Sequence, residues 1–126
     1  MPLDVHDHPK PIYTTKGDWS ALIVTPYIFD TAGEWIGWVS SEDEVYDING
    51  SYVGWLTDEG RILRKRSANK MEKRESPEPP ESVHAPATIP LPPMMRELPY
   101  GVIDVLDEEP RRLHTLGSGE LKEDMN

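Results

Sequence analysis

The sequence predicts an all-β protein with a small antiparallel body of repeated β-hairpins and an extended, proline-rich C-terminal arm. Three observations lead to this prediction. A pattern of β-branched, aromatic and glycine residues recurs in the first half of the chain. Eight of the 13 prolines fall within residues 75–99. The 126-residue chain is only 37% hydrophobic, which is low for one fully packed globule.

The recurring pattern gives three complete repeats and the start of a fourth. The repeats begin at Ile12, Ile28, Val45 and Ile62, so successive starts are 16, 17 and 17 residues apart. β-branched and aromatic residues favour half-buried strands. Each complete repeat also has a glycine at the same place, where a hairpin turn requires positive φ. These glycines are Gly17, Gly33 and Gly50. Each repeat therefore reads as one β-hairpin.

The turns have their own signals. Asn49-Gly50 is a favoured pair for a type I′ turn. Asp30 and Asp47 precede their turns, where an aspartate side chain accepts hydrogen bonds from the turn backbone. We expect that structural role for both carboxylates, in preference to catalysis.

Alternation of side chains then assigns faces to the strands. It places Ile36 with Trp38 on one face, and Trp35 with Val39 on the other. Gly37 leaves a gap that a neighbouring backbone or ring fills. We expect the hairpins to roll around a shared tryptophan-rich centre, because large aromatic side chains supply most of the area in a small core. The alternative is a stacking platform for a ligand, formed by Trp35, Trp38 and Trp55.

The phrases Gly33-Glu-Trp-Ile-Gly-Trp38 and Asp47-Ile-Asn-Gly-Ser-Tyr-Val-Gly-Trp55 resemble the bacterial four-fold β-flower proteins. Their resemblance to PRC-barrel domains is weaker, because those domains need not repeat so regularly. The resemblance covers residues 12–66 and implies short hairpins around a pseudo-four-fold axis, as a flower or small barrel. It implies no catalytic residues. The fourth repeat departs from the pattern after Leu63, which leaves open whether this chain or a partner closes the fold.

A basic run follows the repeats. Residues 61–74 contain seven Lys or Arg residues and one acid, whereas the whole chain has 23 acids, 13 bases and a net charge of -10. Such a run can bind nucleic acid. Because no aromatic residues interleave with it and the rest of the chain repels phosphate, two other interpretations are better. The run is a solvated strand end and helix, or it is a docking surface, with Arg64 and Arg66 as contact residues, for an acidic partner or for this chain's own acidic end.

The C-terminal half divides into an arm and a last strand. Residues 75–99 should be extended, because proline fixes φ and lacks a donor. Residues 100–106 read as one short strand that completes the fourth hairpin or joins a partner's sheet. We divide the chain into an N-terminal arm (1–11), the hairpin domain (12–66), a basic and then proline-rich linker (67–99), and a C-terminal strand with an acidic tail (100–126).

The apolar part of the arm suits a groove on another protein, and the alternative is a disordered tether. Together with Arg64 and Arg66, the residues expected to bind a partner are Ile89, Leu91, Pro92, Pro93, Met94, Met95, Tyr100 and Val102. The sequence thus predicts a non-catalytic accessory subunit that docks on a larger protein complex or on a second copy. The alternatives are a ligand-binding β module that uses the tryptophans and nucleic-acid binding through residues 61–74.

Several kinds of chemistry find no support in the sequence. Cysteine is absent, so disulfides and thiol nucleophiles are excluded, which favours the cytoplasm for so small a domain. No phosphate-binding, dinucleotide or catalytic motif occurs. His6 and His8 lack a third nearby histidine to share a metal. We expect no catalytic residue, no cofactor, no metal and no insertion into a membrane.

Overall fold

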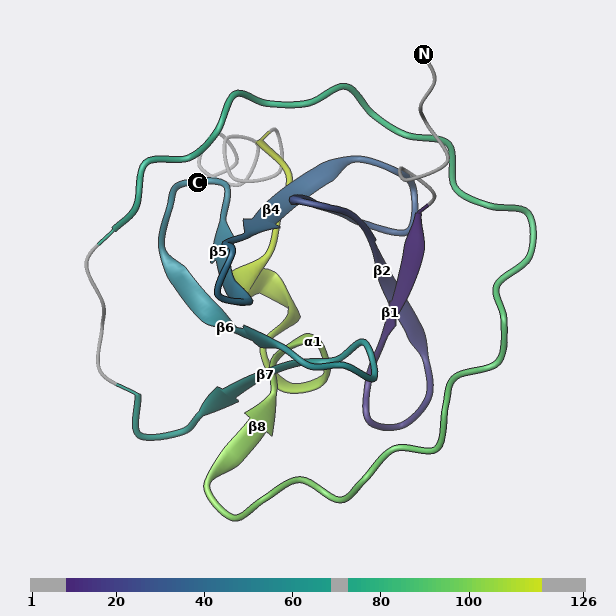
Figure 1. Ribbon diagram of the computed structural model, residues 1–126, viewed down its shortest axis with the longest axis vertical. Helices are drawn as coiled ribbons and strands as arrows, with labels where there is room; N and C mark the ends of the chain where they lie inside the picture. The colour runs from purple at the N-terminus through teal and green to yellow at the C-terminus, as the bar shows by residue number, and fades with distance from the viewer. Residues whose placement is uncertain (1–8, 69–72, 117–126) are drawn as a thin grey trace, which may run out of the picture.

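The computed structural model describes residues 9–68 and 73–116, and over them it confirms the all-β architecture. Each strand pairs antiparallel with the next, and the sheet curls around a central axis (Figure 1). The strands are β1 (Lys10–Tyr13), β2 (Trp19–Val24), β3 (Tyr27–Phe29), β4 (Trp35–Val39), β5 (Glu44–Asp47), β6 (Tyr52–Leu56), β7 (Ile62–Lys65) and β8 (Val102–Asp104). A short helix, α1 (Val105–Glu108), and a 3-10 turn, η2 (Pro110–Arg112), follow β8.

The strands form four hairpins, which we call petals: β1–β2, β3–β4, β5–β6 and β7–β8. The fourth petal is closed by this chain itself, because β8 pairs with β7 in the register Lys65↔Val102 and Leu63↔Asp104. The expected strand over residues 100–106 is therefore present in part. It ends at Asp104, and α1 begins at Val105.

The tips of the first three petals share one five-residue turn. In the third petal, the Gly50 N–H donates to the Asp47 carbonyl over 3.0 Å. Gly50 has φ 87°, but Asn49 is not in the positive-φ region. The expected type I′ turn is wrong, because that turn requires positive φ at both central residues. The expected aspartate role is confirmed, since Asp47 Oδ1 accepts from the backbone N–H groups of Asn49 and Ser51 at 2.9 Å.

A β-bulge in each of the first three petals changes which side chains share a face. In the second petal, Ile28 pairs with Gly37 and Phe29 pairs with Trp35, so Ile36 has no partner of its own. This extra residue breaks the alternation of the strand. The predicted pairing of Ile36 with Trp38 on one face is therefore wrong. Ile36 lies on the inner face of the curled sheet, and Trp38 lies on the outer face.

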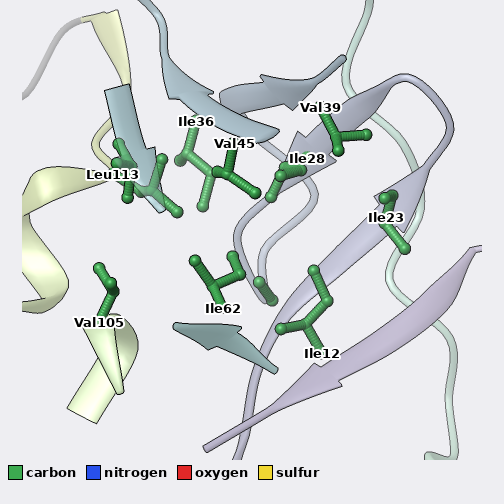
Figure 2. Packing of buried hydrophobic residues seen from close by; sticks show 11 residues of the cluster. Ile12, Ile23, Ile28, Ile36, Val39, Val45, Ile62, Val105 and Leu113 are labelled. Atoms are coloured by element: carbon green, nitrogen blue, oxygen red, sulfur yellow. The ribbon is translucent and has the colours of Figure 1, made fainter. Parts of the chain in front are cut away.

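The centre of the curled sheet is aliphatic. The first residue of every repeat is fully buried there, and Figure 2 shows these side chains converging with Val105 and Leu113. The expected tryptophan-rich centre is wrong, because the bulges turn the indole rings outward. Isoleucine and valine suit the narrow space where the petals meet, since their branched side chains fill it from a pleated strand.

The aromatic residues form a second cluster on the outer face. Trp38 stacks on Tyr46 with ring centroids 4.7 Å apart, and Tyr27 meets Trp35 edge-on at 6.4 Å. Trp35 and Trp38 are buried. An outer face of this kind needs a cover, and the proline-rich segment supplies it, because Val83 and Ile89 pack against the cluster.

This cover, residues 73–99, we call the belt. Figure 1 shows it running around the outside of the petals as a nearly closed ring. It contains no helix or strand, as expected from its prolines. The Arg66 N–H donates to the Gly101 carbonyl over 2.6 Å, so the chain on either side of the belt meets at the fourth petal. The belt is thus the connection between β7 and β8, carried once around the molecule.

Candidate protein-binding surface

The belt has an inner face that repeats every three residues. From Pro77 onward, every third residue is half-buried, and all of these residues are apolar. They are Pro77, Pro80, Val83, Pro86, Ile89, Pro92, Met95 and Leu98. A period of three is that of the polyproline II helix, which has three residues per turn and no internal hydrogen bonds. The belt therefore turns one apolar row of a polyproline II-like chain towards the petals.

Exposed apolar side chains also line the outer side of the last part of the belt and the residue that follows it. Leu91 is 90% exposed, Met94 is 95% exposed and Tyr100 is fully exposed. Their spacing of three and six residues matches the same period, which places them on one side of the chain together with the exposed Glu97. We call these three residues the outer stripe. The belt earlier in the chain carries exposed polar residues instead, among them Glu78, Glu81 and His84.

The predicted partner-binding residues therefore divide into two groups. Ile89, Pro92 and Met95 turn towards this chain's own petals. The outer stripe and Pro93 face away from them. Val102, at the start of β8, is half-buried.

The two predicted arginines have carboxylate partners within the chain. Arg64, whose side chain is 12% exposed, contacts Glu109 at 2.7 Å. Arg66 lies 3.6 Å from Glu108. Both pairs tie the fourth petal to α1 and the residue after it. The basic run also contributes Arg61, paired with Glu59 at 3.1 Å, and Arg74, which sits 5.2 Å from the centre of the Tyr46 ring.

A cavity of about 950 Å³ lies beside the outer stripe. Its apolar walls are Trp55, Tyr100 and Val102, and Lys65 and Arg66 supply positive charge. Trp55 is half-buried, so the structure separates it from the buried Trp35 and Trp38 and places it with residues predicted to bind a partner. Lys65 was not singled out by the sequence, although its place at the end of β7, opposite Val102, brings it here.

Three tyrosines, Tyr13, Tyr46 and Tyr52, stay protonated at neutral pH because burial raises the pKa of each. Burial, followed by the hydrogen bond to Glu44, raises the pKa of Tyr46. Burial also raises the pKa of Tyr52 and of Tyr13. These phenols therefore act as neutral hydrogen-bond donors, and the Tyr13 hydroxyl donates to the Pro90 carbonyl of the belt at 2.5 Å.

Within residues 9–68 and 73–116, no group of three or more His, Asp or Glu side chains could hold a metal ion. His6 and His8 lie outside the described residues. None of the helices within these ranges has the length and apolar character needed to cross a membrane.

Comparison with protein families gives a match over most of the chain. The family described as 4-fold beta flower protein matches residues 10–102. The chain belongs to this family. The match spans the first three petals and the whole belt and reaches the first residue of β8, so in this flower protein the belt lies within the family region. No curated protein and no solved structure matches the chain.

Proposed function

We propose that this flower protein is a non-catalytic interaction subunit that docks on a larger protein assembly through its β body and the outer stripe. The observation that carries the proposal is the exposure of Leu91, Met94 and Tyr100 on one side of the belt. Contiguous exposed apolar groups mark interaction sites in folded proteins.

The surroundings of the outer stripe suit a protein partner. Pro93 is exposed beside the outer stripe. The cavity next to Tyr100 adds Trp55 and the cations Lys65 and Arg66. Aromatic and arginine side chains at the centre of an apolar patch are typical of binding hot spots. Ile89, Pro92 and Met95 support the surface from behind, because they anchor the belt on the petals. The partner is a larger complex or a second copy of the chain.

The cavity supports a second candidate function. The candidate ligand is a small molecule that contacts Trp55 and Tyr100 and carries an acidic group for Lys65, because these residues line the same cavity. Tryptophan fluorescence of the wild type, compared with Trp55→Phe, tests this alternative on addition of sugars or nucleotides. Nucleic-acid binding is weaker as a candidate, because Arg61, Arg64 and Arg66 already lie beside carboxylates.

Exchange of the outer stripe tests the main proposal. The variant Leu91→Ser/Met94→Ser/Tyr100→Ser removes the apolar groups, and the matched control Glu81→Ser/His84→Ser/Ala87→Ser changes three exposed belt residues elsewhere. Tagged full-length proteins are recovered from native cells, and their size in solution is measured. We expect the stripe variant to lose partners, or self-association, that the control keeps. Equal recovery and equal size for both variants contradict the proposal.

A further inference from the structure

We infer that the outer face of the first three petals is a polyproline II-binding surface, on which the belt is an intramolecular ligand that a proline-rich segment of another chain can replace. This inference concerns the inner face of the belt. It does not depend on docking through the outer stripe.

The belt meets the petal tips at a regular interval. The Arg74 N–H donates to the Gly50 carbonyl and the Val83 N–H donates to the Gly33 carbonyl, both at 2.9 Å. Pro92, which has no N–H, lies 3.5 Å from the Cβ position of Gly17. The three belt residues are nine positions apart, which is three turns of a polyproline II helix, or about 28 Å. The third, second and first petals therefore present the same docking point in turn.

The tip glycines make this docking possible. A Cβ atom on Gly50 would lie 1.8 Å from the Arg74 carbonyl oxygen, and one on Gly33 would lie 1.9 Å from that of Val83. Gly60 occupies the same position in the turn between β6 and β7, with a similar φ of 89°, but its Cβ position faces Pro11 and not the belt. The close approach of the belt thus adds a second requirement for glycine at the tips of the second and third petals, whereas Pro92 lies at an ordinary contact distance from the Cβ position of Gly17.

Between the tips, tyrosines hold the backbone of the belt. The Tyr13 hydroxyl donates to the Pro90 carbonyl, and the Tyr27 hydroxyl donates to the Glu78 carbonyl over 3.3 Å. Val83 and Ile89 pack against the outer aromatic cluster. Aromatic grooves whose polar groups bind free carbonyls are a general mode of polyproline II recognition. The ligand class follows: an extended segment with proline or an aliphatic residue at every third position.

The belt masks this surface in the wild-type chain. Because the chain before and after the belt is fixed at the fourth petal, the effective concentration of the belt at the grooves is of the order of millimolar or higher. A free peptide with the same contacts is therefore excluded at micromolar concentration. Weakening the belt without changing the petals should open the surface.

The experiment uses a fluorescent peptide with the sequence of residues 76–98 and three full-length proteins. One is the wild type, and one carries the inward changes Val83→Ser/Ile89→Ser/Met95→Ser. The third is a control with the adjacent outward changes Leu91→Ser/Pro93→Ser/Met94→Ser. We expect the inward variant to bind the peptide at least about tenfold more tightly than the other two proteins. We also expect faster proteolysis of its belt. Equal peptide binding by all three proteins, or an inward variant whose belt stays protected, overturns the inference.

A second protein keeps the test decisive if the inward variant fails to fold. A protease site inserted between the exposed residues His84 and Ala85 allows the belt to be cut in the folded protein, while β8 and the buried Val105 and Leu113 retain the C-terminal segment. The cut protein should bind the peptide, and Tyr13→Phe/Tyr27→Phe should weaken that binding severalfold by removing two donors. Absence of binding to the cut protein overturns the inference.

Discussion

Thr15 and Asp104, which are 89 positions apart, hold the first petal to the fourth through two hydrogen bonds. The backbone N–H and the hydroxyl of Thr15 both donate to Asp104 Oδ2, each over 2.6 Å. Arg61 Nη1 in turn donates to the Thr15 hydroxyl over 3.1 Å. β1 and β8 are the two edges of the described sheet. Side chains therefore close the ring between these petals.

The first prediction concerns this closure. Asp104 is almost fully buried, so Asp104→Ala leaves the Thr15 donors without their acceptor in the interior. We expect a loss of about 2–4 kcal/mol in the free energy of unfolding, measured with urea. Asp107→Ala is the matched control, because it removes a 3.4 Å ion pair between the exposed Lys16 of the first petal and α1, the helix that follows the fourth petal. Its cost should stay below about 1 kcal/mol. Similar losses for both variants would contradict this account.

The second prediction concerns the close approach of neighbouring strands. A Cβ atom on Gly54 would lie 2.2 Å from the Leu63 carbonyl oxygen, so Gly54→Ala must push β6 and β7 apart. We expect it to cost at least about 2 kcal/mol by urea unfolding. At Gly101 a Cβ atom meets nothing within 4 Å, although φ is 78°. Gly101→Ala should therefore cost only the backbone strain, about 1 kcal/mol. The reverse order of stability would be inconsistent with packing by contact.

Much of the architecture follows from local chemistry that one sequence displays. The glycine spacing locates the hairpins, because a turn with positive φ favours glycine wherever it occurs. The turn contacts of Asp30 and Asp47 can be predicted from the sequence, because those hydrogen bonds reach only two to four residues along the chain. The gap expected at Gly37 is filled by a neighbouring backbone, the Tyr46 carbonyl.

The parts that were predicted wrongly depend on single residues or on distant contacts. One bulge residue, such as Ile36, reverses the face of every later side chain in its strand. Alternation alone therefore placed the tryptophans at the centre. The belt was expected to be extended, but nothing local in Val83 or Ile89 indicates that they cover this chain's own aromatic cluster. The signal in the sequence that could have indicated this packing was the recurrence of an apolar residue at every third position of the belt.

The third prediction concerns a non-glycine residue in a glycine position. The turn between β4 and β5 has the same hydrogen bonds as the petal tips, with Asp43 at φ 65° in place of glycine. Asp43→Gly removes the left-handed strain and keeps the backbone bond from the Leu56 N–H to its carbonyl. We expect a gain of up to about 1 kcal/mol in thermal or urea unfolding. As a control, Asp58→Gly changes an exposed residue that does not have positive φ, so it should bring no gain in stability.

The fourth prediction concerns acid stability at Glu59. Burial by itself raises the pKa of this carboxyl, but hydrogen bonds from Thr57 and Arg61 and the positive charges of Arg61 and Arg96 outweigh it and lower the pKa below its ordinary value of 4.5. A carboxyl with a lowered folded-state pKa stabilises the protein fully above its unfolded pKa, and this contribution is lost as the pH falls through the folded value. Glu59→Gln should therefore destabilise the protein at about pH 7 and cost progressively less below about pH 4.5.

Urea unfolding of the wild type and the variant across this range gives the difference directly. Glu81→Gln, on the exposed part of the belt, controls for the loss of one negative charge. A cost that stays constant with pH would mean that Arg61 gains nothing from the ionised form.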